Sequence, residues 1–150
     1  MKIQTAHFGE IEYDAAQAFH FQSGLPGLEE DTEFALLASD ETQPIFWLQS
    51  LTRAQVSLPV VNPLLLCPTY SFDIPDADTE ALELRDVQDV CILSVLVIPP
   101  ENADAMTVNL AAPVILNMKN HQGRQILLND KNYSTKTPVS DLLETLEAKS

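Results

Sequence analysis

Cysteine is scarce in this 150-residue sequence, which contains only Cys67 and Cys91. Their spacing fits no zinc-binding or redox motif, so we expect two reduced, buried thiols, and a disulfide between them stays an open alternative. Low-complexity runs and internal repeats are absent, and 45% of the residues are apolar. This composition excludes a disordered chain, and the length predicts a single globular domain.

Long apolar runs are also missing. The longest covers residues 90–100 and is interrupted by Ser94, whereas a membrane-spanning helix needs roughly 20 apolar residues. The single basic residue near the amino end, Lys2, is followed by no apolar stretch, so no export signal is visible. We therefore predict a cytoplasmic protein that does not enter a membrane.

Basic residues are few: eight Lys and Arg stand against 22 Asp and Glu, which leaves a net charge of −14. Phosphate backbones are repelled by such a chain, so direct binding of nucleic acid is excluded. A basic protein partner, in contrast, would be attracted and its encounter accelerated. The same charge also serves simply to keep a protein in solution.

Catalytic motifs are absent as well. The three histidines have no acidic or thiol partner nearby in the sequence, and no nucleophile elbow, phosphate loop, dinucleotide fingerprint or zinc-protease motif occurs. Acids are densest at 29–31 and at Asp73, Asp76 and Asp78, where turns and a helix start explain them. An EF-hand reading of the second group fails, because the twelfth position is Leu84. We expect no enzyme activity, metal, cofactor or small-molecule substrate; a small β-barrel hydrolase with paired carboxylates is the alternative.

Short apolar segments separated by turn residues dominate the sequence. The expected strands cover residues 3–8, 11–13, 18–22, 34–38, 45–49, 56–61, 90–98, 107–118 and 124–128. Pro59 favours an edge or bulged strand for 56–61, and Pro113 a bend or bulge in 107–118. With no alternation of strands and helices, the pattern predicts an all-β, antiparallel barrel or sandwich-like single domain.

Helix is predicted only in two short pieces. Residues 76–84 follow Pro75 and begin with acids, which suits a helix amino end. Residues 141–147 place Leu142, Leu143 and Leu146 on one side. We accordingly divide the chain into a barrel domain, 1–138, and a tail, 139–150, that forms a short amphipathic helix or frays.

Five motifs in register make the chain resemble the FliW family of flagellar assembly factors. They are FQSGLPGL at 21–28, WLQS at 47–50, VNP at 61–63, NLAAPVILN at 109–117, and RQILL at 124–128 followed by Tyr133. Their order and spacing match from about residue 3 to about residue 138. The sequence departs from the family at Leu28, where Phe is commoner, and in the segment after Pro138.

The resemblance implies an antiparallel β-barrel-like fold without a cofactor. It also implies two protein partners, flagellin and the translational regulator CsrA, with binding of CsrA relieving repression of flagellin translation. A flagellin-dedicated chaperone that does not engage CsrA is the alternative within the same class of binding proteins.

Two sets of residues follow from these motifs. Structural roles are expected for the residues that set turns or interrupt strands: Gly24, Pro26, Gly27, Asn62, Pro63, Asn109, Pro113, Asn117 and Gln125. Partner contacts are predicted where aromatic residues and proline alternate with acids, at Tyr70, Phe72, Asp73, Pro75 and Asp76, with Trp47 as a second position. In the alternative reading, Tyr70 and Phe72 point inward and only the acids face water.

Overall fold

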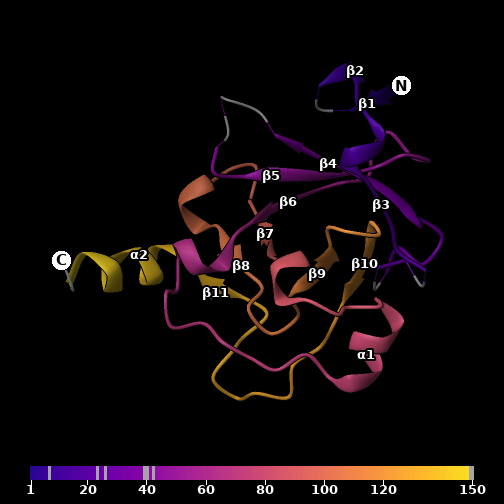
Figure 1. Cartoon of the computed structure of the whole chain (residues 1–150). Coiled ribbons are helices and arrows are strands. Elements are labelled where there is room, and N and C mark those ends of the chain that lie inside the picture. Colours follow the sequence, from indigo (N-terminus) through magenta and orange to yellow (C-terminus); the bar gives the residue numbers. More distant parts are fainter. Residues whose placement is uncertain (7, 23, 26, 39–40, 42, 149–150) are drawn as a thin grey trace.

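The computed structural model describes residues 1–6, 8–22, 24–25, 27–38, 41 and 43–148 (Figure 1). The strands are β1 Lys2–Thr5, β2 Gly9–Glu12, β3 Ala18–His20, β4 Glu33–Ala38, β5 Phe46–Ser50, β6 Ser57–Val61, β7 Val90–Val97, β8 Thr107–Val108, β9 Val114–Asn117, β10 Gln122–Gln125 and β11 Thr137–Pro138. The helices are α1 Asp76–Ala81 and α2 Val139–Ala148, with short 3-10 turns η1 Ala15–Gln17, η2 Pro63–Leu65, η3 Val87–Asp89 and η4 Ala103–Ala105. The all-β prediction is confirmed.

In the described part of the chain, seven strands close into a barrel. Their order is β7-β6-β5-β4-β3-β10-β9, and β9 pairs again with β7. Every pairing in this ring is antiparallel except β3 with β10, which is parallel and joins one residue pair, His20 and Gln122. The β1–β2 hairpin forms a separate sheet above the barrel (Figure 1). Closure removes most of the exposed edges that an open sheet would leave unpaired.

Strand alternation fills the barrel with large apolar side chains. Inward positions on the strands, with two residues from the segment after β3, form one buried cluster: Phe19, Phe21, Leu25, Phe34, Leu48, Val60, Leu93, Val114 and Leu116. Gly123 of β10 occupies an inward position without a side chain, and a Cβ there would lie 2.5 Å from the Phe21 ring. The fully buried Phe21 ring therefore takes the space that a β10 side chain would need.

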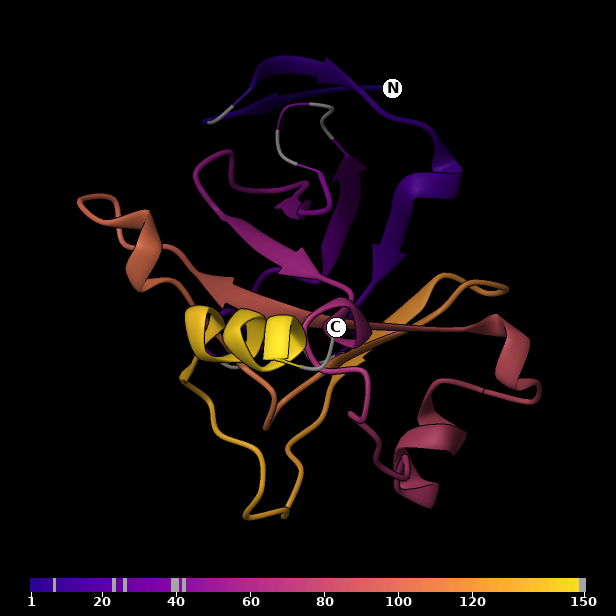
Figure 2. The ribbon, with the colours of Figure 1, turned by 90° about the vertical axis from the view of Figure 1, so that its left-hand side faces the viewer.

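Two further clusters cover the outside of the barrel. Tyr70, Val108 and Val139 belong to the first, against which Leu142 of α2 packs. Leu82, beside α1, packs with Ile115 and Ile126 in the second. β9 is consequently buried on both faces, because Val114 and Leu116 point into the barrel while Ile115 faces Leu82. Both views place α2 beside η2 (Figure 2).

Some predicted strands end earlier or break. The expected strand 107–118 is two strands, because the Asn109 side chain accepts hydrogen bonds from the amides of Ala111 and Ala112 and thereby forms a turn. The expectation of an edge strand around Pro59 was also wrong, since β6 lies between β5 and β7. The β6–β7 ladder involves Val60 and Val61, so Pro59, which lacks an amide proton, lies outside it.

The helices differ from the prediction mainly in their bounds. α1 ends at Ala81 rather than near residue 84, and Glu83 adopts a positive φ of 54°. α2 covers most of the segment after Pro138, with Val139 buried, Leu142 and Leu146 half-buried and Leu143 exposed. Of the helices in the described ranges, none has both the length and the apolar character of a membrane span. Cys67 and Cys91 are free and half-buried.

Candidate binding site

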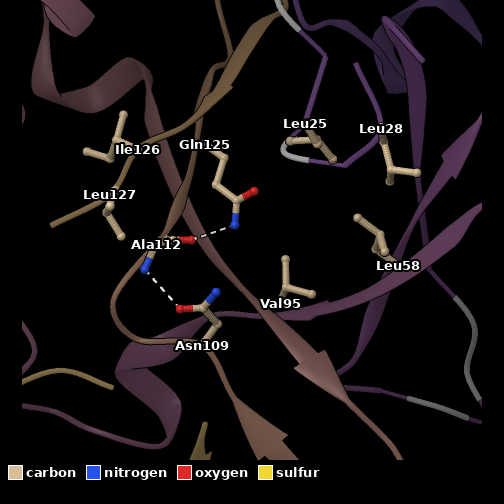
Figure 3. A pocket seen from close by; sticks show the side chains of 9 residues that line it. All are labelled: Leu25, Leu28, Leu58, Val95, Asn109, Ala112, Gln125, Ile126 and Leu127. Carbon is tan, nitrogen blue, oxygen red and sulfur yellow. Dashed lines mark hydrogen bonds between the residues drawn. The ribbon is translucent and has the colours of Figure 1, made fainter. Parts of the chain in front are cut away.

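A hollow of about 460 Å³ lies at one mouth of the barrel. Leu25 and Leu28 line it from the turn after β3, Leu58 and Val95 from β6 and β7, and Leu127 from the extended segment after β10 (Figure 3). These side chains are apolar, and several continue the core cluster of the barrel outward. The mouth is thus an opening into the apolar barrel interior.

Two amide side chains supply the polar groups of the mouth. Gln125 donates its Nε2 hydrogen to the carbonyl of Ala112 at 2.9 Å, and the Oδ1 of Asn109 accepts from the Ala112 amide at 2.9 Å (Figure 3). These bonds hold the irregular segment between β8 and β9 against β10. The Nδ2 of Asn109 and the Oε1 of Gln125 form no hydrogen bond with any described residue. One donor and one acceptor therefore remain available at the mouth.

The turn on the opposite side of the mouth depends on its glycines. Gly24 and Gly27 have φ angles of 65° and 81°, which glycine adopts at little cost. A Cβ at Gly24 would also lie 2.6 Å from the backbone of Glu29. The turn closes through a 2.7 Å bond from the Leu28 amide to the Leu25 carbonyl, and Pro26 lies outside the described residues.

The predicted contact segment around Tyr70 lies on another part of the molecule. Tyr70 is 6% exposed, and its hydroxyl donates to the carbonyl of Leu110 at 2.6 Å. Its ring packs edge-on against that of Tyr133 and lies beside the half-buried Phe72. Burial raises the pKa of Tyr70 well above its usual range. Tyr70 faces the interior, so it offers little surface to a partner.

The remaining predicted contact residues do not form one surface. Asp73, Pro75 and Asp76 are exposed, and Asp73 lines a shallow hollow of about 360 Å³ with Phe72. Trp47 belongs to β5, where its half-buried ring lies edge-on to Phe8. β5 and α1 lie on opposite sides of the molecule (Figure 1), so the structure does not bring Trp47 together with the segment before α1.

The other residues singled out from the motifs make backbone contacts. Asn62 accepts a hydrogen bond from the Leu64 amide at the start of η2, and Pro63 is the first residue of that turn. The carbonyl of Pro113 accepts from the Ile126 amide at 3.0 Å. The buried Asn117 side chain donates to the carbonyl of Leu82 at 2.8 Å, which ties the end of α1 to β9.

Two of the acids considered as catalytic candidates are engaged by arginines. Asp31 is buried and accepts hydrogen bonds from Ser50, Thr52 and the guanidinium of Arg53. The Arg53 hydrogen bond, opposed by burial and assisted by the two hydroxyls, lowers the pKa of Asp31 to about 2. Such a carboxylate stays ionised and is a poor proton donor. Asp78 pairs with Arg124 at 2.6 Å.

Histidine chemistry offers no clearer site. His20 pairs with Glu33 at 2.5 Å on the outer surface, and His121 donates from Nδ1 to the carbonyl of Ala18 at 2.9 Å; His7 lies outside the described residues. Over the described ranges, no group of three or more His, Cys, Asp or Glu side chains is placed to hold a metal ion.

Sequence reasoning named Asn109 and Gln125 but missed the apolar residues between which they lie. Leu25 and Leu28 flank the Pro-Gly turn, and Leu127 follows Gln125 by two residues. Because alternate residues of a strand share a face, Leu127 could have been placed on the same side as Gln125. Leu58 and Val95 carried no such signal, because they read as ordinary core positions.

Comparison with known proteins gives a consistent result. The family model described as FliW protein matches residues 2–139. The flagellar assembly factor FliW of Pseudothermotoga lettingae is 39% identical over 142 residues, with 95% of this chain and 90% of the relative covered. That of Thermoanaerobacter pseudethanolicus is 34% identical over 145 residues, with 96% of each chain covered.

A solved structure agrees with these sequences. A crystal structure of the flagellar assembly factor FliW superposes with a TM-score of 0.85 at 32% identity, and covers 93% of this chain and 96% of the other. The match extends over the whole barrel and over all five motifs, three of which (21–28, 109–117 and 124–128) contribute residues to the mouth. The chain therefore belongs to the FliW family of flagellar assembly factors.

Proposed function

We propose that this chain is a cytoplasmic regulator of flagellar assembly that binds flagellin and a CsrA-type translational regulator. It makes and breaks no covalent bond; its effect comes from occupying its partners. When flagellin is exported, the freed chain binds the CsrA-type protein and relieves the repression of flagellin translation. Membership of the FliW family supports this proposal, since its relatives are named as flagellar assembly factors.

The observation that carries a binding function is the chemistry of the barrel mouth. Among the described residues that line it, all are apolar except Asn109 and Gln125, which carry amides, and none is charged. Fixed amides in an apolar hollow recognise and orient a ligand, but they supply neither an acid nor a nucleophile. A site of this composition fits binding better than catalysis.

The charge of the chain provides a mechanism for antagonism. With a net charge of −14, the chain raises the local negative potential when it sits on an RNA-binding protein. RNA phosphates must then approach against that potential, and salt screens the repulsion over about 10 Å at 0.1 M ionic strength. The antagonism should therefore weaken as the salt concentration rises.

Titration of the chain into a preformed complex of CsrA with fluorescent RNA tests this proposal. We expect RNA release at low salt, and a smaller release at high salt under conditions where binding of the chain to CsrA persists. A chain that binds flagellin but leaves the RNA complex intact would instead be a dedicated flagellin chaperone. Release that is the same at both salt concentrations would contradict the electrostatic mechanism.

The exposed segment before α1 is a second proposed contact, based on Asp73 and the half-buried Phe72 beside it. The double variant Phe72→Ala/Asp73→Ala should lower the affinity for CsrA at least tenfold. A matched control, Val97→Ala/Glu101→Ala, removes an exposed apolar side chain and an exposed acid elsewhere. Equal affinities of the two double variants would remove this segment from the interface.

A further inference from the structure

The chain of β10 continues in an extended form beyond Gln125, the last residue of its ladder with β9. Among the described residues, one edge of this continuation has no partner strand. The amides of Ile126 and Leu128 donate to the carbonyls of Pro113 and Ala111, at 3.0 and 2.7 Å. Because backbone groups alternate in direction along an extended strand, the amide and carbonyl of Leu127 point the opposite way. β3 does not cover that edge, since its pairing with β10 involves only His20 and Gln122.

The backbone of Leu127 has no hydrogen-bond partner among the residues that the structure describes. Its side chain is 70% exposed, although leucine is usually buried. Across the mouth, Leu25 and Leu28 line the opposite side of the hollow from the turn after β3 (Figure 3). An unpaired edge thus lies directly beside an apolar hollow.

From this arrangement we infer that the mouth binds an extended peptide segment by strand addition along Leu127. The segment pairs its backbone with the amide and carbonyl of Leu127 and inserts one aliphatic side chain between Leu25 and Val95. The free Nδ2 of Asn109 and Oε1 of Gln125 meet a carbonyl and an amide of the same segment. Main-chain bonds provide affinity in this mode of recognition, and the hollow provides the choice of side chain.

Charge indicates which segment fits. Glu29 and Glu30 are exposed and directly follow Leu28 at the rim, and the chain as a whole carries a net charge of −14. A second copy of this chain would bring the same negative charge to the edge and be repelled. A partner segment with lysine or arginine on either side of its aliphatic residue would be attracted. The inference rests on the proposed function, to which it adds a mode of contact.

A synthetic peptide tests strand addition without either proposed partner. The probe is a fluorescein-labelled nonapeptide with the sequence KTKVLVKTK, and its binding to the full chain is followed by fluorescence anisotropy. In antiparallel pairing, the central leucine both enters the hollow and bonds to Leu127, because directly opposed residues share a face. N-methylation of the leucine amide should weaken binding at least tenfold, whereas N-methylation of the preceding valine should change it less than threefold. Equal effects of the two methylations would overturn strand addition.

Variants of the chain supply the complementary test. Leu127→Pro removes the free amide hydrogen and should weaken peptide binding at least tenfold, whereas Leu127→Ala keeps that hydrogen and should weaken it less. Circular dichroism and the melting temperature show whether each variant is folded, and Val97→Ala serves as an exposed control. Two results would refute the inference: binding that Leu127→Pro leaves unchanged, or a concentration-dependent dimer that competes with the peptide, which would assign the edge to a second copy.

Discussion

Replacement of the buried Asp31 carboxylate by an amide should destabilise the barrel and remove one step from its acid titration. In the folded chain this carboxylate accepts hydrogen bonds from Ser50 at 2.7 Å, from Thr52 at 3.0 Å and from the Arg53 guanidinium. Asn at this position keeps one acceptor oxygen but loses the charge. Its NH₂ group, itself a donor, would face the donor groups of Ser50, Thr52 and Arg53 and could not accept their hydrogen bonds. Hydrogen bonds to a charged group contribute about 1.5–3 kcal/mol. The Arg53 side chain is 42% exposed and can turn to water, so we expect a loss of about 2–3 kcal/mol.

This loss can be measured by heat and by acid. For a chain of 150 residues, the entropy of unfolding is about 0.3 kcal/mol/K, so 2–3 kcal/mol lowers the melting temperature by about 6–10 °C. The pKa of Asp31 is lowered from 3.8 to about 2 in the folded state, first by the Arg53 hydrogen bond. Its contribution is therefore fully present above pH 4 and is lost as the pH falls from about 4 to 2, where the unfolded chain binds the proton first.

Urea unfolding of wild type and Asp31→Asn between pH 7 and pH 2.5 separates the loss of the hydrogen bonds from the loss of the charge at Asp31. The difference in unfolding free energy between them should shrink as the pH falls below 4. Asp73→Asn, at an exposed position, is the matched control and should stay within about 0.5 kcal/mol of wild type. A cost for Asp31→Asn below 0.5 kcal/mol, or a difference that does not change with pH, would refute the reasoning.

Two further substitutions test the packing of the barrel and its outer cluster. Gly123→Ala places a Cβ 2.5 Å from the Phe21 ring, and this overpacking should lower the free energy of unfolding in urea by about 1–3 kcal/mol. Adding Phe21→Leu should recover part of that loss. If the losses of the two single variants simply add in the double variant, the Phe21 ring is not the obstacle. Tyr70→Phe removes the 2.6 Å bond to the carbonyl of Leu110 and should cost about 1–2 kcal/mol, with unchanged binding of CsrA; weaker binding would place this buried side chain in the interface.

The barrel could be predicted largely because local patterns and tertiary structure agree. Short apolar segments bounded by turn residues located β4, β5 and β7 within two residues of their observed bounds. Closure could not be predicted in the same way. It depends on the parallel contact of His20 with Gln122, two positions about a hundred residues apart, and no local pattern encodes such a contact.

The candidate site was predicted only in part, for a related reason. Asn109 stood out as a polar residue in an apolar segment and Gln125 as part of the motif at 124–128, and both were expected to have structural roles. The hydrogen bonds that join both of them to Ala112, and the hollow beside them, depend on how β9 and β10 meet the turn at Leu25. The segment around Tyr70 was chosen for its aromatic and acidic composition, which does not reveal the direction in which each ring points.

The single residue pair that joins β3 to β10 has a consequence for how the protein is synthesised. Leu25 lies just after β3 and Gln125 at the end of β10, so the two walls of the mouth come from opposite ends of the barrel sequence. While the ribosome is still synthesising the first hundred residues, one wall exists without the other. Chains therefore gain the capacity to hold a partner at this mouth only once β10 has emerged and the ring has closed. A fragment that ends before β10 would keep six of the seven barrel strands but would lack Gln125 and Leu127, and with them one wall of the mouth.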